Sequence, residues 1–460
     1  MDQFISSQPA ILGGTPVRTA AFQGRRTMGE AEKRAVQDVL DSDCLSGFLG
    51  APGPHFDGGP QIRAFERAWA QATEVPHALS FNSLTTGLMA AMGAIGLEPG
   101  DEVICPPYTM SASATSALFY GGVPVFADID PETFCIDPVS VAQRITPRTR
   151  AVVAVHLFGH PADMDALLAL CEPRGIAVIE DAAQAPGVRY KGRPVGGIGT
   201  IGGFSLNYHK HIHTGEGGVM TTRDSRLARR LSLIRNHGEN IMAGDASAED
   251  LGNMLGANYR LTELQAAIGL AQLPRLEAIL RHRQNLGAHL SRRLQGLPGI
   301  TPATVRAGCD HAFYLYPVRF NAGQAGLSRT QFVRAVAAEL PTPTGWQTTP
   351  FAEGYVKPLY LSPLYQRRVA IGSRGFPFNV SGAKPSYARG LCPVTERAYA
   401  SDLIVTSLVR EPLTVADMDD FADAIEKVLT HAAAIANHGT GSPEAAPFTP
   451  TQAAALADVR

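Results

Sequence analysis

From about residue 78 onward, the sequence alternates short apolar runs with stretches whose apolar residues have helical spacing. The apolar runs are typical of strands and read HALSFN, DEVICPP, VPVFADID, RAVVAVHLFG and IAVIEDAA. Strands that alternate with helices indicate a mostly parallel, doubly wound α/β sheet. Ligands of such sheets bind at the carboxyl ends of the strands. We therefore expect an α/β fold whose functional site lies around the residues that follow these runs.

The length and the changes of pattern along the chain suggest how it divides. Its 460 residues suit a large domain and a smaller one. We expect an N-terminal arm over residues 1–30 and a large domain over residues 31–290, which includes a long amphipathic helix interrupted at Pro274. Residues 291–436 should form a smaller C-terminal α+β domain. The tail, residues 437–460, is rich in Ala, Pro and Thr and is expected to be disordered.

The composition restricts the partners and the compartment. Lys and Arg number 40 against 42 Asp and Glu, and no basic run stands out, so nucleic acid is not an expected partner. No apolar run is long enough to cross a bilayer, and the N-terminus lacks the pattern of a signal peptide. The six cysteines show no CxxC spacing and are expected to be free thiols in a reducing compartment. We expect a cytoplasmic protein.

One lysine stands in an unusual context. The segment FSLNYHKHIHTGEGG places Lys210 in a loop of small residues, and the apolar run before it ends in Asp181. A lysine among glycines is normally a solvated surface residue, but an apolar frame lowers the pKa of its amine, which suits a Schiff-base nucleophile. With a carboxylate to hold a pyridine nitrogen protonated, this arrangement is what pyridoxal phosphate chemistry needs. Asp181 also fits a helix N-cap, whereas the nearby Gln184 favours the cofactor.

The segment SFNSLTTGL stands between a predicted strand and a predicted helix. Backbone N–H groups of Leu84, Thr85 and Thr86 would point out of the helix N-terminus, where an anion such as a phosphate is favoured. The hydroxyl of Thr85 could add to such a site, and so could that of Ser205 in FSLNY. Ordinary capping of the helix by Ser83 explains the same residues equally well.

Two further patterns resemble sites but lack their context. The glycines of GGIGTIGG have GxGxxG spacing, but no strand precedes them and a strand-like segment follows, so a dinucleotide site is not expected. His209, His211 and His213 alternate like metal ligands, yet no carboxylate or cysteine stands beside them. We expect no metal site.

Six motifs, in order, resemble the DegT/StrS sugar-aminotransferase family of fold-type I pyridoxal phosphate enzymes. They are PGDEVICPPYT, GGVPVFADIDPETFCIDP, ITPRTRAVVAVHLFGHPADMDAL, VIEDAAQAPGVRYKGRPVG, FSLNYHKHIHTGEGG and NYRLTELQAAIGLAQL. The similarity runs from about Gly13 to about Leu429. It implies a mostly parallel, seven-stranded sheet between helices in the large domain, a pyridoxal 5'-phosphate cofactor, and a homodimer with shared active sites.

The resemblance also implies roles for individual residues. Lys210 matches the Schiff-base lysine and Asp181 the partner of the pyridine nitrogen, which makes these two the expected catalytic residues. The other expected cofactor contacts are Gln184 at the phenolic oxygen, Ser205, Leu84 and Thr85 at the phosphate, Met110 on the pyridine ring, and Asn258 at the phosphate of the neighbouring subunit.

Two of these positions depart from the family pattern. The family usually has glycine at the position of Leu84, and a leucine there restricts the backbone of the phosphate loop. It usually has a ring-stacking aromatic residue at the position of Met110. Methionine covers a ring less rigidly, and Tyr108 could compensate for the change.

The reaction that the resemblance implies is transfer of an amino group. The donor would be L-glutamate or L-glutamine, and the acceptor a keto group, first on a nucleotide-linked sugar and next on a cyclitol. Two alternatives stay open: a dehydratase or aromatizing synthase of the same fold, and a non-enzymatic regulator. Lys210 argues against the dehydratases of the family that carry histidine there, and no helix-turn-helix segment supports regulation.

Overall fold

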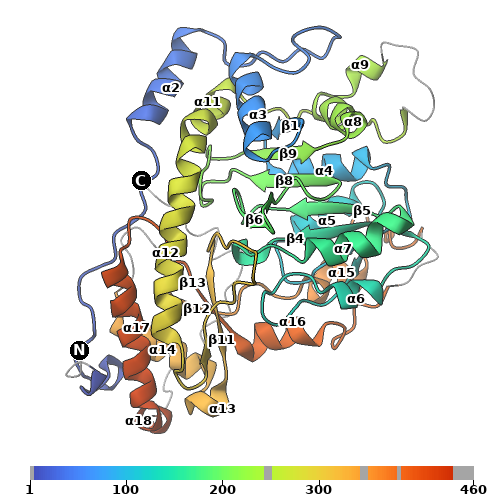
Figure 1. The fold of residues 1–460 in the computed structure, drawn as a ribbon. Coiled ribbons are helices and arrows are strands. Elements are labelled where there is room, and N and C mark those ends of the chain that lie inside the picture. The colour runs from blue at the N-terminus through green and yellow to red at the C-terminus, as the bar shows by residue number, and fades with distance from the viewer. Residues whose placement is uncertain (1–4, 243–250, 342–350, 381–384, 439–460) are drawn as a thin grey trace.

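A seven-stranded sheet forms the centre of the larger part of the molecule (Figure 1). The computed structural model describes residues 5–242, 251–341, 351–380 and 385–438. The strand order is β1-β9-β8-β5-β4-β2-β3. The strands are β1 (His77–Phe81), β2 (Glu102–Cys105), β3 (Val123–Phe126), β4 (Thr149–Val155), β5 (Ala177–Asp181), β8 (Ile201–Ser205) and β9 (Gly218–Thr222).

Strand direction agrees with the expected fold class. The strands β3, β2, β4, β5 and β8 pair in parallel, and β9 is antiparallel to both of its neighbours, β8 and β1. The mostly parallel α/β sheet is therefore confirmed. Parallel neighbours bring their carboxyl ends to one edge, so the residues after β2, β4, β5 and β8 meet there.

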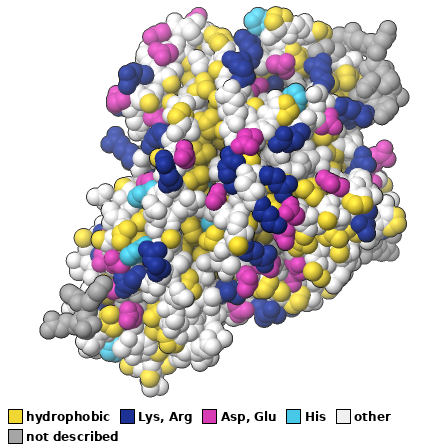
Figure 2. Space-filling model, in the orientation of Figure 1, with side chains coloured by type: hydrophobic (Ala, Val, Ile, Leu, Met, Phe, Trp, Pro, Cys, Tyr) yellow, Lys and Arg dark blue, Asp and Glu magenta, His cyan; other side chains and the backbone are white. Residues whose placement is uncertain are grey.

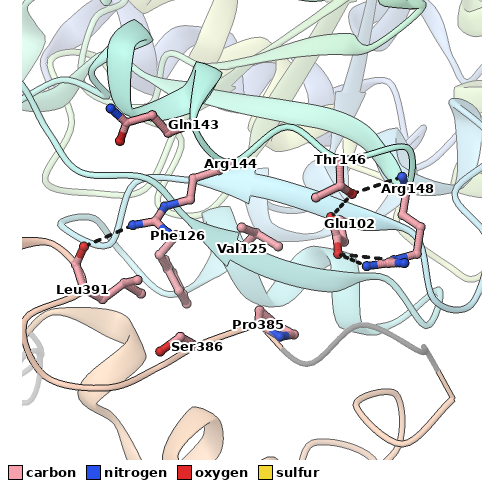
Figure 3. Close-up of a pocket in the computed structure, with 10 residues that line it drawn as sticks. All are labelled: Glu102, Val125, Phe126, Gln143, Arg144, Thr146, Arg148, Pro385, Ser386 and Leu391. Carbon is pink, nitrogen blue, oxygen red and sulfur yellow. Dashed lines mark hydrogen bonds and ion pairs between the residues drawn. The ribbon is translucent and has the colours of Figure 1, made fainter.

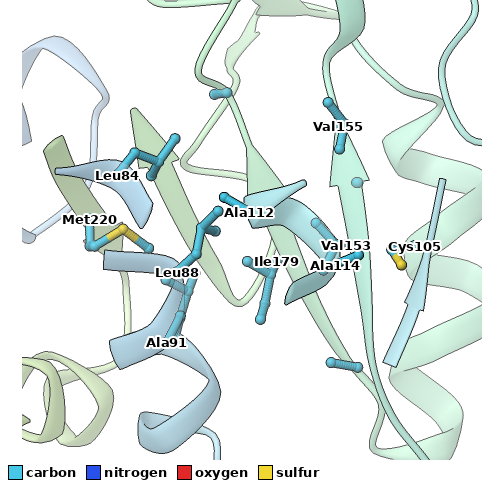
Figure 4. Close-up of a cluster of buried hydrophobic side chains, with 14 of the residues drawn as sticks. Leu84, Leu88, Ala91, Cys105, Ala112, Ala114, Val153, Val155, Ile179 and Met220 are labelled. Atoms are coloured by element: carbon cyan, nitrogen blue, oxygen red, sulfur yellow. The ribbon is translucent and has the colours of Figure 1, made fainter. Parts of the chain in front are cut away.

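Several helices gather in two groups around this sheet. One group is α4 (Leu84–Ala94), α5 (Ala112–Leu118) and α8 (Ser225–Arg235), and α4 also contacts β8 and β9. The other group contains α6 (Pro138–Ala142) and α7 (Met164–Cys171), which contacts β5. Figure 4 shows the apolar layer between α4 and the sheet, where Leu84 and Leu88 lie with Met220 and Ile179.

A nearly continuous helix runs the length of the molecule (Figure 1). It consists of α11 (Glu263–Gln272), a 3-10 turn (Leu273–Arg275) and α12 (Leu276–Leu294). The turn contains Pro274, which has no N–H to donate to the preceding turn, and this confirms the predicted interruption. Further helices are α2 (Glu30–Asp41), α3 (Pro60–Ala72) and α9 (Glu239–Met242), and β6 (Arg189–Tyr190) pairs with β7 (Arg193–Pro194).

A second, antiparallel sheet has its own apolar core. Its order is β10-β11-β13-β12, with β10 (Ile300–Thr301), β11 (Tyr316–Phe320), β12 (Phe351–Glu353) and β13 (Leu403–Thr406). The helices near it are α13 (Ala322–Ala325), α14 (Arg329–Glu339), α17 (Val415–Thr430) and α18 (Ala432–Asn437). Phe22, from the segment expected to be an arm, is fully buried in this core. The predicted disordered tail lies outside the described residues from 439 onward.

Between β12 and β13 the chain leaves the small sheet and covers the edge of the large one. This excursion carries a 3-10 turn (Leu359–Leu361), α15 (Pro363–Arg367) and α16 (Pro393–Arg397). The Tyr387 hydroxyl donates to the Pro124 carbonyl of β3 at 2.7 Å, and the Thr395 amide donates to Asp128 at 2.9 Å. Because β3 is an edge strand, this cover protects exposed backbone groups and joins the two sheets.

None of the described helices is both long and apolar enough to cross a bilayer. On the face shown in Figure 2, Lys and Arg side chains lie interspersed with Asp and Glu.

Candidate active site

Asp181 lies at the carboxyl end of β5, in the middle of the large sheet, and is 5% exposed. Its Oδ2 accepts a hydrogen bond from the Ser113 hydroxyl at 2.6 Å, and its Oδ1 accepts one from the Ala183 amide at 3.2 Å. The second bond is the local contact that a capping role predicts, whereas the first comes from α5. Both donors fix the orientation of the carboxyl group.

Lys210 is buried although it sits in a loop, with 7% of its surface exposed. Its Nζ lies 4.4 Å from the centroid of the Tyr314 ring. Burial lowers the pKa of Lys210 to about 8, and the charge of Asp181 opposes part of this effect. Arg25 fixes the backbone, because its guanidinium donates to the Lys210 carbonyl at 2.6 Å and to the His211 carbonyl. The amine is therefore held near Asp181 and loses its proton more readily than a surface lysine.

The N-terminus of α4 shows that capping and anion binding are compatible. Ser83 does cap the helix, because its hydroxyl accepts from the Thr86 amide at 3.2 Å, so this amide is not available to an anion. The amides of Leu84 and Thr85 have no hydrogen-bond partner among the described residues. These two N–H groups can receive an anion, and the Thr85 side chain is exposed beside them.

Gly218 allows β9 to approach this helix end closely. A Cβ at Gly218 would lie 2.5 Å from the Leu84 nitrogen, which real Cβ atoms do not tolerate. Ser205 is the register partner of Gly218, so its hydroxyl lies on the strand beside the free amides. The Leu84 side chain points the other way, into the core, where Gly203 leaves room for it. The leucine side chain therefore fills space in the apolar layer between α4 and the sheet, and its backbone N–H stays outside that layer.

Gln184 is held at both ends of its amide. Its Oε1 accepts from the Phe158 amide at 2.6 Å, and its Nε2 donates to the Tyr355 hydroxyl at 3.0 Å. Burial raises the pKa of Tyr355 to about 12, with a smaller contribution from the Asp181 charge, so Tyr355 is neutral at physiological pH. Tyr355 comes from the excursion after β12 and brings the second sheet to the edge of the site.

Met110 and Asn258 are both exposed to solvent. Met110 is 57% exposed, and its sulfur accepts from the Ala112 amide at 3.2 Å. Asn258 is exposed, and its Oδ1 accepts from Arg260 at 2.9 Å. Tyr108 is fully buried and its hydroxyl accepts from the Tyr355 amide at 2.8 Å. Tyr108 therefore faces no open space, and the expectation that it compensates for Met110 is wrong.

The three alternating histidines point to separate partners. Nε2 of His211 lies 3.0 Å from the Ala312 carbonyl, and Nε2 of His213 lies 2.6 Å from the Thr27 hydroxyl. Burial lowers the pKa of His209 to about 3, with the charge of Lys210 adding to the effect. Within the described ranges, no group of three or more His, Cys, Asp or Glu side chains could hold a metal ion.

The residues present fit pyridoxal phosphate on their own chemistry. A buried lysine of lowered pKa can bind an aldehyde, a carboxylate with two donors can hold a protonated ring nitrogen, and free amides next to Ser205 can hold a phosphate. Sequence reasoning missed Arg25, Ser113, Tyr314 and Tyr355. Ser113 could have been found, since it follows the apolar run DEVICPP, which the sequence predicts to be a strand.

A separate cavity of about 240 Å³ lies away from these residues. Figure 3 shows it between the large sheet and the excursion, with Arg144 donating to the Leu391 carbonyl and Arg148 paired with Glu102. Glu102 begins β2, whereas the site residues follow strand ends. None of the predicted site residues lines this cavity.

Comparison with known proteins agrees with this geometry. Residues 27–381 match the DegT/DnrJ/EryC1/StrS aminotransferase family. The chain belongs to this family, whose members depend on pyridoxal phosphate, and it is an aminotransferase.

Several relatives match at length. The L-glutamine:2-deoxy-scyllo-inosose aminotransferase of Streptomyces lividus is 36% identical, over 92% of this chain and 98% of that protein. The GDP-perosamine synthase of Caulobacter vibrioides is 40% identical, over 67% of this chain and 79% of that protein. The solved structure of DesI in the presence of its TDP-sugar product has a TM-score of 0.75 and 27% identity, over 93% of this chain and 97% of that one. The fold-type I architecture is thereby confirmed.

Proposed function

We propose that this protein uses pyridoxal 5'-phosphate, held through Lys210, to move an amino group from L-glutamine or L-glutamate to a ketone on a polyhydroxylated ring. The observation that carries the proposal is the buried Lys210 amine, whose pKa burial lowers to about 8 and on which the charge of Asp181 acts. When bound, the cofactor supplies an electron sink for the carbanion that forms on loss of the α-proton.

The residues around the ring would divide the work of binding. The amides of Leu84 and Thr85 with the Ser205 hydroxyl would hold the phosphate, and Asp181 the pyridine nitrogen. Gln184 would lie at the phenolic oxygen, Met110 would cover the ring, and Asn258 would reach the phosphate of a second subunit. The exposure of Met110 and Asn258 supports this shared site, because exposed residues are free to meet a partner chain.

Lys210 would carry the proton between carbon atoms. A base works best when its pKa lies near the working pH, and burial brings the amine to about 8. The Ser113 hydroxyl and the Ala183 amide fix the position of the Asp181 carboxyl group, which would stabilise a protonated ring nitrogen before the reaction starts. Tyr314, whose ring covers the amine, favours the charged state of Lys210 after it takes up the proton.

For the acceptor we place a cyclitol ketone ahead of a nucleotide-linked keto sugar. The 2-deoxy-scyllo-inosose aminotransferase of Streptomyces lividus matches 92% of this chain, which includes the excursion between β12 and β13, whereas the GDP-perosamine synthase matches 67%. Its 40% identity keeps the nucleotide-linked sugar as the second candidate.

The assembly and the location belong to the same proposal. Exposed apolar side chains such as Leu255, at 86%, and Leu49, at 57%, suit burial in a homodimer. The two apolar cores support two domains, for which we keep the bounds 31–290 and 291–436 with 1–30 as an arm. The excursion residues Tyr360, Tyr365 and Tyr387 pack in the first core, and Phe22 of the arm packs in the second. Free cysteines suit a cytoplasmic enzyme.

The proposal is tested in two stages. The absorbance of the purified, cofactor-loaded protein is recorded before and after addition of L-glutamine or L-glutamate, and it should shift as the amino group moves to the cofactor. 2-Deoxy-scyllo-inosose and nucleotide-linked keto sugars are then supplied, and the aminated product is identified by mass spectrometry. A Lys210→Ala variant serves as the control. A spectrum that neither donor changes would contradict the proposed donors, and product from the variant would contradict the role of Lys210.

A further inference from the structure

The loop that carries Lys210 relies on contacts from outside itself. Within the loop, the Lys210 amide donates to the Asn207 carbonyl at 2.9 Å, and the Thr214 amide donates to the Leu206 carbonyl at 3.0 Å. Gly215 follows with a φ of 81°, a backbone conformation that glycine adopts freely. Glycine also leaves the chain more freedom to move. Since a side chain follows its backbone, whatever holds this loop also holds the lysine amine.

The N-terminal arm supplies such contacts. The Arg25 guanidinium donates to the Lys210 carbonyl at 2.6 Å and to the His211 carbonyl. Two residues further on, the Thr27 hydroxyl lies 2.6 Å from Nε2 of His213. One short stretch of the arm therefore contacts three residues of the lysine loop, and two of these contacts come from a single charged side chain.

The arm is fixed in the core of the second sheet only three residues before Arg25. Phe22 is fully buried in that core. The guanidinium of Arg18 lies 4.3 Å from the centroid of the Phe22 ring and pairs with Asp417 at 2.8 Å and Asp420 at 2.7 Å, both on α17. Three residues of extended chain reach at most about 10 Å. The position of Phe22 therefore limits where Arg25 can lie.

A buried ion pair holds the beginning of the arm. Glu339 of α14 and Lys427 of α17 are both fully buried, and their charged groups lie 3.0 Å apart. Glu339 accepts from the amides of Ala10 at 2.7 Å and Val17 at 3.0 Å, and Lys427 donates to the Thr15 carbonyl at 2.7 Å. A buried pair is costly unless such hydrogen bonds complete it. The helices of the second sheet are thus completed by the arm.

The arm therefore connects two parts of the molecule. Figure 1 shows it running from the helices of the second sheet to α2. Its first half is anchored to α14 and α17, and its second half to the lysine loop. Between these anchors stand only the residues from Phe22 to Arg25, so a displacement at one end reaches the other.

We propose that the N-terminal arm is a strap through which the second sheet and its helices position the catalytic lysine, with Arg25 as the positioning residue and Phe22 as its attachment. The inference rests on the proposed function, in which Lys210 binds the cofactor. The bonds from Arg25 hold the loop backbone and so keep the amine buried. Without them water would reach Nζ, and the pKa of Lys210 would rise from about 8 toward its ordinary value of 10.5.

The first measurement is hydrogen exchange of the cofactor-loaded protein, read by mass spectrometry on peptides that cover residues 205–217. Rates are expressed relative to peptides of β4, which respond to any overall loosening of the fold. Arg25→Gln should speed exchange in the loop by roughly 10- to 100-fold, the range for hydrogen bonds to a charged group. Arg25→Lys should lie between, because an ammonium still donates but cannot span both carbonyls.

The attachment is tested with variants that leave Arg25 in place. Phe22→Ala should speed exchange in the loop like Arg25→Gln. Arg18→Gln removes the cover of the Phe22 ring without emptying the core, and should have a smaller effect of roughly 3- to 10-fold. It decides the question if Phe22→Ala does not fold. The matched control is Arg293→Gln, which breaks a contact of α12 with α17, to Asp423 at 2.5 Å, and should leave the loop unchanged.

The second measurement separates positioning of the amine from mere support of the loop. The full chain is stripped of cofactor, and its uptake of pyridoxal 5'-phosphate is followed by absorbance against pH. Only a neutral amine can attack the aldehyde, so in the wild type the rate should rise through a midpoint near the Lys210 pKa of about 8. The midpoint should move upward in Arg25→Gln, less so in Arg25→Lys, and stay unchanged in Arg293→Gln.

The outcomes separate the strap from the proposed function. Loop exchange or an uptake midpoint that Arg25→Gln leaves at the wild-type value would overturn the role of Arg25. An effect of Arg25→Gln that the folded Phe22 and Arg18 variants do not share would make that role local and overturn the strap. Shifts in all of these variants, in a protein whose spectrum no amino donor changes, would support the strap and count against the proposed function alone.

Discussion

The two sides of the active site are built in different ways. On one side, Asp181, Ser205 and the N-terminus of α4 follow the ends of neighbouring strands, and backbone register fixes their distances. On the other side, Tyr314 and Tyr355 come from segments that flank strands of the second sheet. The first side carries the groups that suit the cofactor, and the second carries aromatic residues that contact Lys210 and Gln184. The difference suggests that the large sheet provides the reacting groups and that the second sheet holds them in place.

The largest expected effect tests the first side. Lys210→Ala should retain the fold and lose transamination by at least about 1000-fold, because the base that moves the proton is removed. Turnover of donor and acceptor is measured, with thermal unfolding as the check on the fold. Normal turnover in this variant would remove Lys210 from the mechanism.

Asp181→Asn should have the next largest effect. The amide is similar in shape but has no negative charge for a protonated ring nitrogen, and we expect a loss of roughly 100- to 1000-fold in kcat. Ser113→Ala is the matched comparison, because it removes one donor to Asp181 and leaves the charge, and it should cost roughly 3- to 10-fold. Equal effects of the two variants would show that the charge is not what matters.

The pH dependence of stability tests the environment of Lys210 without cofactor. Its pKa is lowered from 10.5 to about 8 on folding, so the unfolded chain binds more protons between these values. Stability of the cofactor-free protein should therefore rise with pH from about 8 to about 10.5, by up to about 3 kcal/mol. The free energy of unfolding is compared for wild type and Lys210→Met. The variant should be the more stable at pH 7, and the gap should close above pH 10. A constant gap would mean that the amine is not desolvated.

The smallest expected effect lies on the second side. Tyr355→Phe removes the hydroxyl that holds Gln184 and should change kcat/KM by roughly 3- to 10-fold. Tyr387→Phe is the control, because its hydroxyl bonds the Pro124 carbonyl at the sheet edge, and it should leave the kinetics unchanged. A larger effect of Tyr355→Phe than of Asp181→Asn would reverse the proposed division between the two sides.

Much of the first side could be predicted because its signals are local. Apolar runs that end in Asp181 and precede Lys210 mark strand ends, and parallel strands bring their carboxyl ends together. The direction of β9 could not be predicted from VMTTRD, since an apolar run has the same pattern in either direction. From the sequence, the N-terminus of α4 could be either an ordinary capped helix end or an anion site. The structure shows that Ser83 caps the Thr86 amide and leaves the amides of Leu84 and Thr85 available to an anion.

The sequence by itself determined the fold class, the family and the positions of Lys210 and Asp181, because strand periodicity and short motifs depend on residues that are contiguous in the chain. Only the tertiary structure decided that Leu84 fills space beside Gly203, that Tyr108 is buried, and that Tyr355 holds Gln184. The hydrogen bond from Arg25 to the Lys210 carbonyl was equally invisible. Their partners are separated by long stretches of chain, and no local pattern records which distant segments pack together.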